Sequence, residues 1–188
     1  MRTIILASAA ALLLAGAARA QQAQPQQQPP PSDEQLIASA MAAAPRAVSE
    51  DAAVVAMDAN GAMRTLRRGT NGFTCMPDDP ASPGTDPMCL DANAMEWLHA
   101  WMAKTEPPDK VGLVFMLVSG SDASNTDPHA TEPPPGGRWI TTGPHLMVVG
   151  GRAVRSMAGY PRTPDPDTSR PYMMWIGSPY EHLMIPVR

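Results

Sequence analysis

The sequence predicts an α+β fold: a single loop-rich domain with a mainly antiparallel sheet and two or three helices. Strand-like apolar runs are intermixed with helical patterns along the chain. Asn60-Gly61 joins two of these runs and is a strong β-hairpin signal. The 188 residues include 22 prolines and 14 glycines, so turns and irregular loops should take a large share of the chain.

Residues 1–20 have the pattern of a signal peptide that is removed on export. Arg2 precedes an apolar run from Ile4 to Leu14, and Ala18-Arg19-Ala20 fits a signal peptidase site. The run is too short to span a bilayer, which takes about 20 apolar residues, and no later segment is longer. We therefore expect a soluble periplasmic or secreted protein without a membrane span after cleavage; a retained N-terminal anchor is the alternative.

The chain that follows the signal peptide is acidic. Removal of Arg2 and Arg19 from the 14 basic residues leaves 12, against 18 acidic ones. No cluster of Lys and Arg forms a basic patch, so we expect no nucleic-acid binding. Residues 21–31 are rich in Gln and Pro, which predicts a disordered spacer. Residues 32–188 have the length of one globular domain.

The first elements of this domain are predicted by local signals. Ser32 is the expected N-cap of a helix, with Gln35 as its capping-box partner, and Pro45 ends that helix. The two strands of the hairpin are expected at Ala53–Asp58 and Met63–Arg67. The chain thus begins with a helix followed by a hairpin.

The next segment, Gly69–Pro87, is dense in Pro, Gly and Asp and has only Phe73 as a large apolar anchor. This composition predicts a long irregular loop. Cys75 and Cys89 are the only cysteines, and in an oxidising compartment such a pair predicts a disulfide. Closing a loop of about 15 residues contributes on the order of 3 kcal/mol, less where prolines already stiffen the unfolded chain.

A second helix and a central strand are expected next. Asp91 or Asn93 caps the helix, and Pro107-Pro108 bars its continuation. One face of the helix is predicted to carry Met95, Leu98, Trp101 and Met102. The uninterrupted apolar run Val111–Val118 is typical of a strand covered on both faces.

The C-terminal part predicts a series of short strands. After a polar loop at Ser119–Gly137, four strand-like runs follow: Arg138–Thr141, His145–Val149, Pro171–Ile176 and His182–Val187. Gly150–Ala158, between the second and third run, predicts a short helix.

A repeated tripeptide, His145-Leu146-Met147 and His182-Leu183-Met184, is the sharpest pattern for chemistry. A strand period of two places the His and Met of each repeat on one face. If the two strands are neighbours, two imidazoles and two thioethers can converge as a soft ligand set for copper in the Cu(I) state. The alternative is that the methionines fill the core and the histidines are polar tips at strand ends.

The polar loop after the central strand, Ser119–His129, is the second candidate, because loops that follow buried strands often carry sites. It supplies five candidate residues: Ser121, Asp122, Asn125, Asp127 and His129. Asp122, Asn125 and Asp127 offer oxygen ligands for calcium, although their spacing departs from an EF-hand loop. The alternative is a loop whose side chains bond their own backbone.

The same loop allows a hydrolase hypothesis. Ser121 or Ser124 would be the nucleophile, with His129, His145 or His182 as the base. The Gly-x-Ser-x-Gly elbow of many hydrolases is absent.

Three stretches carry a resemblance to known sequences. They are Phe73-Thr-Cys-Met-Pro-Asp-Asp-Pro through Asp86-Pro-Met-Cys-Leu90, Ser121-Asp-Ala-Ser-Asn-Thr-Asp-Pro, and Pro179-Tyr-Glu-His-Leu-Met-Ile-Pro. They resemble a group of uncharacterised exported bacterial proteins. The resemblance favours export and implies no activity.

These observations together predict an exported, non-enzymatic domain that binds a small ligand, a metal ion or another envelope protein. A hydrolase built on the polar loop is the alternative.

Overall fold

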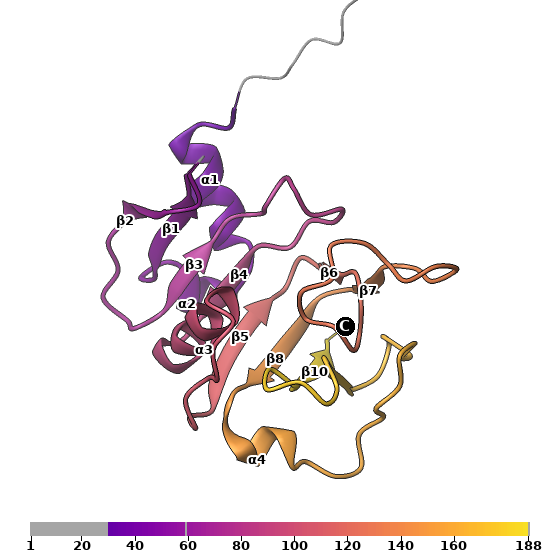
Figure 1. Ribbon diagram of the computed structural model, residues 1–188. Coiled ribbons are helices and arrows are strands. Elements are labelled where there is room, and N and C mark those ends of the chain that lie inside the picture. Colours follow the sequence, from indigo (N-terminus) through magenta and orange to yellow (C-terminus); the bar gives the residue numbers. More distant parts are fainter. Residues whose placement is uncertain (1–29, 59, 188) are drawn as a thin grey trace, which may run out of the picture. The chain divides into compact units, whose positions relative to one another are not determined.

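The α+β prediction is confirmed: an eight-stranded, mainly antiparallel sheet carries helices on both faces (Figure 1). The computed structural model describes residues 30–58 and 60–187. Pro31–Arg188 is a compact unit of its own. The predicted signal peptide and most of the spacer lie outside the described residues.

The helices and strands of the described residues follow the chain in this order: α1 (Asp33–Met41), α2 (Arg46–Ser49), β1 (Ala53–Met57), β2 (Met63–Arg67), β3 (Thr74–Met76), β4 (Met88–Leu90), α3 (Ala92–Met102), β5 (Gly112–Met116), β6 (Gly120–Asp122), β7 (Ile140–Thr142), β8 (His145–Val149), α4 (Gly151–Arg155), β9 (Tyr172–Met174) and β10 (His182–Pro186). The main sheet has the order β2-β1-β3-β4-β5-β8-β10-β9, and β6 pairs with β7 in a second, two-stranded sheet. Among the described strands of the main sheet, only β1 and β3 are parallel to each other.

Helix α1 covers one face of the sheet at its β1, β3 and β4 end. Ser32 caps it through the predicted capping box, in which Ser32 and Gln35 each accept the other's backbone N–H. The core beneath it is built from alanines, Val54 and the two cysteines. Small side chains allow the helix backbone to approach the sheet closely.

The predicted disulfide is present and belongs to this core. Cys75 of β3 and Cys89 of β4 lie directly opposite each other in the sheet and are bonded. Both are fully buried. The bridge therefore joins two adjacent strands of the sheet, and the irregular chain between them forms the loop that it closes.

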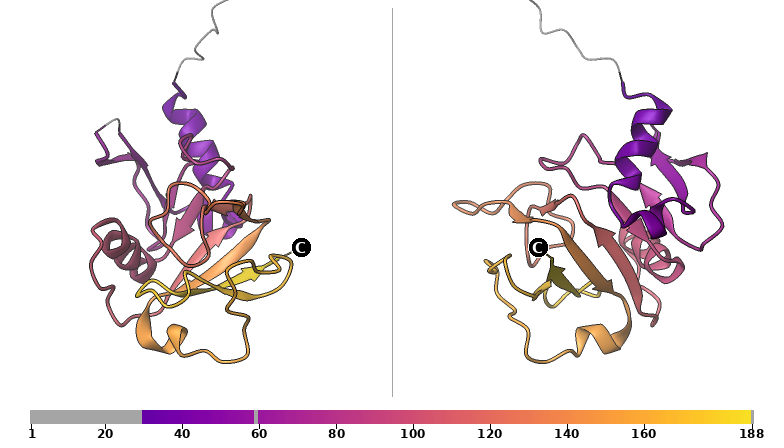
Figure 2. Two further views of the ribbon diagram at one scale, coloured as in Figure 1. Left: turned by 45° about the vertical axis from the view of Figure 1, so that its right-hand side comes forward. Right: turned by 180° about the vertical axis from the view of Figure 1, so that it is seen from behind.

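Helix α3 packs on the opposite face, against β4 and β5 (Figure 2). Asp91 is its N-cap, since its carboxylate accepts the Ala94 N–H at 2.8 Å. Of the four side chains predicted to share one face of this helix, Leu98 is buried, whereas Met102 at the end of the helix is 42% exposed. The buried stripe runs through Ala94, Trp97 and Leu98, one residue earlier in the helical repeat, so Met102 turns away from the sheet.

Helix α4 lies at the other end of the sheet and contacts β10. Val154 of α4 packs with Met173 and Leu183 on the face that also carries the disulfide. Strands β8, β10 and β9 are thus covered by α4 on one side and by the α3 core on the other.

Two predicted loops each contain a short strand. Thr74–Met76, inside the expected Gly69–Pro87 loop, is β3, and Gly120–Asp122, inside the expected polar loop, is β6. Strands of three residues have no measurable apolar period, so only their pairing partners define them. In the described part of the chain, no helix has the length and apolar character needed to cross a membrane.

Candidate functional site

The two His-x-Met repeats lie on neighbouring strands. β8 and β10 are antiparallel, and Met147 lies directly opposite Met184. All four side chains are buried on the α3 face of the sheet. His145 lies opposite Pro186, whereas His182 lies beyond the other end of the paired segment. The structure therefore brings the two thioethers together and places the two imidazoles at opposite ends.

Each histidine also has a methionine opposite it on the other strand that neighbours its own. His145 pairs with Met116 of β5, and His182 pairs with Met174 of β9. Each histidine thus has one methionine across from it and one two residues along its own strand. We call this set the Met/His band; its members are Met116, His145, Met147, Met184, His182 and Met174. All six are buried.

Both imidazoles of the band are held in one orientation by the backbone. His145 Nδ1 lies 2.7 Å from the Gly143 carbonyl and His182 Nδ1 lies 2.9 Å from the Tyr180 carbonyl. A carbonyl oxygen only accepts, so in each neutral ring Nδ1 carries the proton and Nε2 carries the lone pair. Neither Nε2 has a hydrogen-bond partner among the described residues.

Burial favours the neutral form of both imidazoles. Burial lowers the pKa of His145. Burial, with a smaller contribution from the charge of His145, lowers the pKa of His182 to about 4. Two unprotonated ring nitrogens, each with a free lone pair, therefore lie in a thioether-lined interior.

Indole rings cover the His182 end of the band. The His182 ring centroid lies 4.9 Å from that of Trp175 and 5.4 Å from that of Trp97, both in T-shaped arrangements. Trp175 follows β9 with a φ of 54°, a backbone conformation uncommon for a bulky residue. The Nε1 atoms of both indoles are buried without a partner among the described residues. Native interiors contain few such unpaired groups, so each one calls for an explanation.

The aromatic rings continue from the band to the protein surface. Trp101 stacks on Trp175 with centroids 5.6 Å apart, and His129 stacks on Trp101 at 5.8 Å. Trp101 and His129 are half-buried. His129, a predicted site residue, therefore packs on an indole face at the outer end of this stack.

The β6–β7 sheet covers the His145 end. A Cβ atom at Gly120 would lie 2.8 Å from Cε1 of His145 and 3.0 Å from Cε of Met116. Only a glycine leaves room for β6 to approach these two side chains so closely.

The five predicted residues of the polar loop differ in their surroundings. Ser121 and Asp122 belong to β6, whereas the Asn125 side chain is buried. Asp127 is exposed and accepts the His129 backbone N–H at 2.9 Å, as in the self-bonded turn proposed as the alternative.

The hydrolase hypothesis requires a serine paired with a histidine. In the described residues no serine hydroxyl hydrogen-bonds a histidine ring. Ser124 Oγ instead accepts the backbone N–H groups of Thr126 and Asp127, at 3.1 and 2.9 Å. The structure thus offers this hypothesis no paired nucleophile and base.

Two carboxyl groups of this region are unusual. Burial, together with the nearby Asp86, raises the pKa of Asp122 to about 8, and burial also raises the pKa of Asp86. Even so, residues 30–58 and 60–187 contain no group of three or more His, Cys, Asp or Glu side chains arranged to hold a metal ion. The calcium prediction therefore has no cluster of carboxylates to support it.

Two residues that lie opposite the histidines were not predicted as site residues: Met116 and Met174. Met116 was assigned to the central strand and Met174 to a strand-like run, but their positions opposite the histidines depend on strand register. No local pattern in the sequence reports that register.

Comparisons with protein families, curated proteins and solved structures find no match for this chain. The resemblance to exported bacterial proteins stays a prediction. Any function must therefore be argued from the chemistry of the side chains themselves.

Proposed function

We propose that this protein is an exported Cu(I)-binding domain with one site at each end of the Met/His band. One site consists of His145 with Met116 and Met147, and the other of His182 with Met174 and Met184. The observation that carries the proposal is the pair of buried imidazole Nε2 atoms, each unpartnered and each flanked by two methionines.

The geometry of the histidines supports a metal. Metal-binding histidines usually donate their second ring N–H to a carbonyl or carboxylate, which fixes the tautomer and aims the other nitrogen at the metal. His145 and His182 both have this arrangement, through Gly143 and Tyr180. A bound ion would also account for two polar atoms that are otherwise buried without partners.

The ligand type selects the ion. Thioether sulfur is a soft, neutral ligand that favours Cu(I), whereas calcium, magnesium and manganese favour carboxylate and carbonyl oxygen. No carboxylate belongs to the band. One imidazole and two thioethers leave the charge of the ion uncompensated, which suits a monovalent cation better than a divalent one in a buried site.

Two features support the proposed location of the protein outside the cytosol. The Cys75–Cys89 disulfide is typical of proteins outside the reducing cytosol. The N-terminal signal peptide predicted from the sequence would direct the chain there.

The test is an anaerobic titration of the purified protein with Cu(I) against a chromophoric Cu(I) chelator. We expect about two Cu(I) per chain for the native sequence. Met174→Leu/Met184→Leu and Met116→Leu/Met147→Leu should each weaken one site at least about tenfold, because leucine preserves volume and removes the sulfur.

Met173→Leu is the matched control. Met173 is as deeply buried as Met174 and belongs to the same strand, but it points to the opposite face. It should leave both affinities unchanged. Absence of Cu(I) binding by the native protein, or equal binding by all four proteins, would rule the proposal out.

A further inference from the structure

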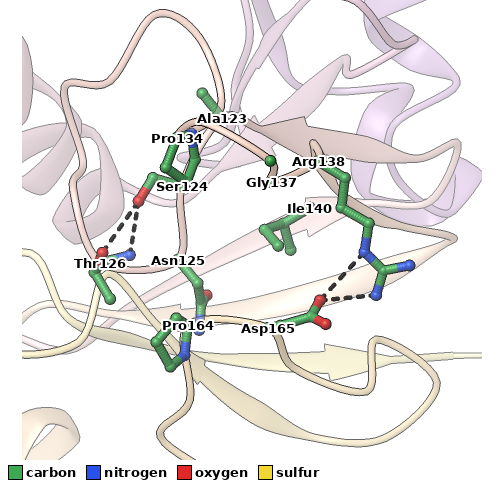
Figure 3. Close-up of a pocket in the computed structure, with 11 residues that line it drawn as sticks. Ala123, Ser124, Asn125, Thr126, Pro134, Gly137, Arg138, Ile140, Pro164 and Asp165 are labelled. Atoms are coloured by element: carbon green, nitrogen blue, oxygen red, sulfur yellow. Dashed lines mark hydrogen bonds and ion pairs between the residues drawn. The ribbon is translucent and has the colours of Figure 1, made fainter.

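A separate pocket lies beside the polar loop. Its volume is about 350 Å³, and it is formed by the polar loop, the segment before β7 and the segment before β9 (Figure 3). Ile140, Pro134 and Pro164 give it apolar walls. It shares no residue with the band, so a proposal for this pocket can be tested independently of the Cu(I) proposal.

Asn125 forms a rigid part of the pocket wall. The side-chain Nδ2 of Asn125 donates to the Thr163 carbonyl at 2.6 Å and to the Met173 carbonyl at 3.1 Å. The backbone carbonyl of Asn125 accepts the Ile176 N–H at 3.1 Å. These bonds fix which end of the amide is nitrogen and hold the side chain in place. The residue is 1% exposed, and its Oδ1 has no hydrogen-bond partner among the described residues. The wall therefore contains an acceptor that lacks a donor.

Two opposite charges occupy the other side of the pocket. Figure 3 shows Arg138 and Asp165 facing each other there, with Asn125 and Thr126 across from them. Arg138 uses Nε and Nη2 to bind Asp165 Oδ1, at 3.2 and 2.8 Å. Both side chains are about 70% exposed, at 72% and 70%. A well-hydrated ion pair of this kind can exchange partners at little cost.

We infer that this pocket binds a small zwitterion, an α-amino acid with an apolar side chain. The ammonium group would be accepted by Asp165 and by Oδ1 of Asn125. The carboxylate would be bound by the guanidinium of Arg138, which is suited to planar carboxylates. The ligand side chain would lie against Ile140 and the two prolines.

The charge balance of the pocket supports a zwitterion over a simple ion. An anion alone would leave Asp165 without its partner, and a cation alone would do the same to Arg138. A ligand that carries both charges replaces both halves of the ion pair at once and also supplies the donor that Asn125 lacks.

The experiment is isothermal titration of the full-length protein with a panel of apolar α-amino acids. The N-acetyl and methyl ester forms of each binder serve as charge-deleted probes. We expect at least one amino acid to bind, with affinity at least about tenfold lower when either charge is masked, the effect of losing one charge-assisted contact.

Variants of the pocket provide the second arm. Arg138→Gln and Asp165→Asn should each weaken binding at least about tenfold. Asp167→Asn, which removes the exposed Arg170–Asp167 pair two residues away, is the control and should change nothing. The inference is overturned if no amino acid binds at about 10 mM, if the masked forms bind as well as the parent, or if binding survives both pocket substitutions.

Discussion

The two faces of the main sheet differ in side-chain composition and in whether their buried polar atoms are hydrogen-bonded. The face beneath α1 is closed with alanines, Val54 and a disulfide, and within the described residues none of its buried side-chain polar atoms lacks a partner. The face beneath α3 is filled with methionine, tryptophan and histidine, and four of its buried polar atoms are unpaired. They are Nε1 of Trp97 and Trp175 and Nε2 of His145 and His182.

This difference suits one face to stabilising the fold and the other to binding a ligand. The core beneath α1 combines small side chains, close helix packing and a disulfide. It contributes stability and, among the described residues, presents no unpaired polar atom to a ligand. A core of polarizable side chains with free lone pairs is less favourable to fold, since each unpaired buried group costs about 1–3 kcal/mol. Where such groups persist in native proteins, each calls for an explanation such as stored strain, a catalytic role, an ordered water or a bound ion. Under the proposed function, the α1 face stabilises the fold and the α3 face carries the Cu(I) sites.

Removal of the disulfide should have the largest effect on stability. Cys75→Ala/Cys89→Ala is expected to lower the free energy of unfolding by up to about 3 kcal/mol, because the unfolded chain regains the freedom of a loop of about 15 residues. Urea denaturation measures this loss.

The same variant sharpens the comparison of the two faces. The cysteines and the Met/His band lie on opposite sides of the sheet, so Cu(I) stoichiometry should stay unchanged while stability falls. Native stability in the variant, or loss of Cu(I) binding without loss of fold, would mean that the two faces do not divide the roles in this way.

A smaller effect is expected at Asp122, at the edge of the α3 face. Its pKa is raised to about 8 in the folded protein, above its ordinary value of 3.8. Between these two values the unfolded chain loses the proton while the folded protein keeps it, so the contribution of Asp122 to stability falls as pH rises. Asp122→Asn has no such titration. The stability of this variant relative to the native protein should therefore rise by about 2 kcal/mol between pH 5 and pH 6.5.

Comparing the two proteins at each pH isolates this residue. The low pKa of His182 also makes stability depend on pH below 6.5, but it does so equally in both proteins and cancels in the difference. Asp127→Asn, an exposed carboxyl of the same loop, is the control. If the gain of Asp122→Asn over the native protein is the same at both pH values, burial of that carboxyl does not matter to folding.

The sequence predicted the elements that carry local signals. The Ser32 capping box, the Asn60-Gly61 hairpin, the Asp91 cap and the apolar run of β5 all depend on residues close together in the chain. Strands β3 and β6, with three residues each, exist only through partners far along the chain. Nothing within three residues could reveal them.

The candidate site divides in the same way. A strand period of two was enough to place His145 and Met147 on one face, and the structure confirms it. That Met116 and Met174 stand opposite the histidines follows from strand order and register, which are set by the whole fold. The pocket around Asn125 likewise joins segments about 40 residues apart in the chain.

The smallest expected effect measures how much a hydrogen-bonded pair of buried hydroxyls on the α3 face contributes to the free energy of unfolding. The hydroxyls of Tyr172 and Thr142 are both buried and lie 2.7 Å apart. Tyr172→Phe leaves the Thr142 hydroxyl without this partner and should lower the free energy of unfolding by about 1–2 kcal/mol. Adding Thr142→Val removes the second hydroxyl at nearly constant volume.

The double variant should therefore recover much of the lost stability, as measured by urea denaturation. The reason is that the main cost of the single change is a stranded hydroxyl, and the lost hydrogen bond itself is worth less. Recovery would show that this face penalises unpaired groups strongly, which makes the unpaired His145 and His182 harder to explain without a ligand. If the double variant is no more stable than Tyr172→Phe alone, unpaired groups are tolerated here and the contrast between the two faces loses its functional meaning.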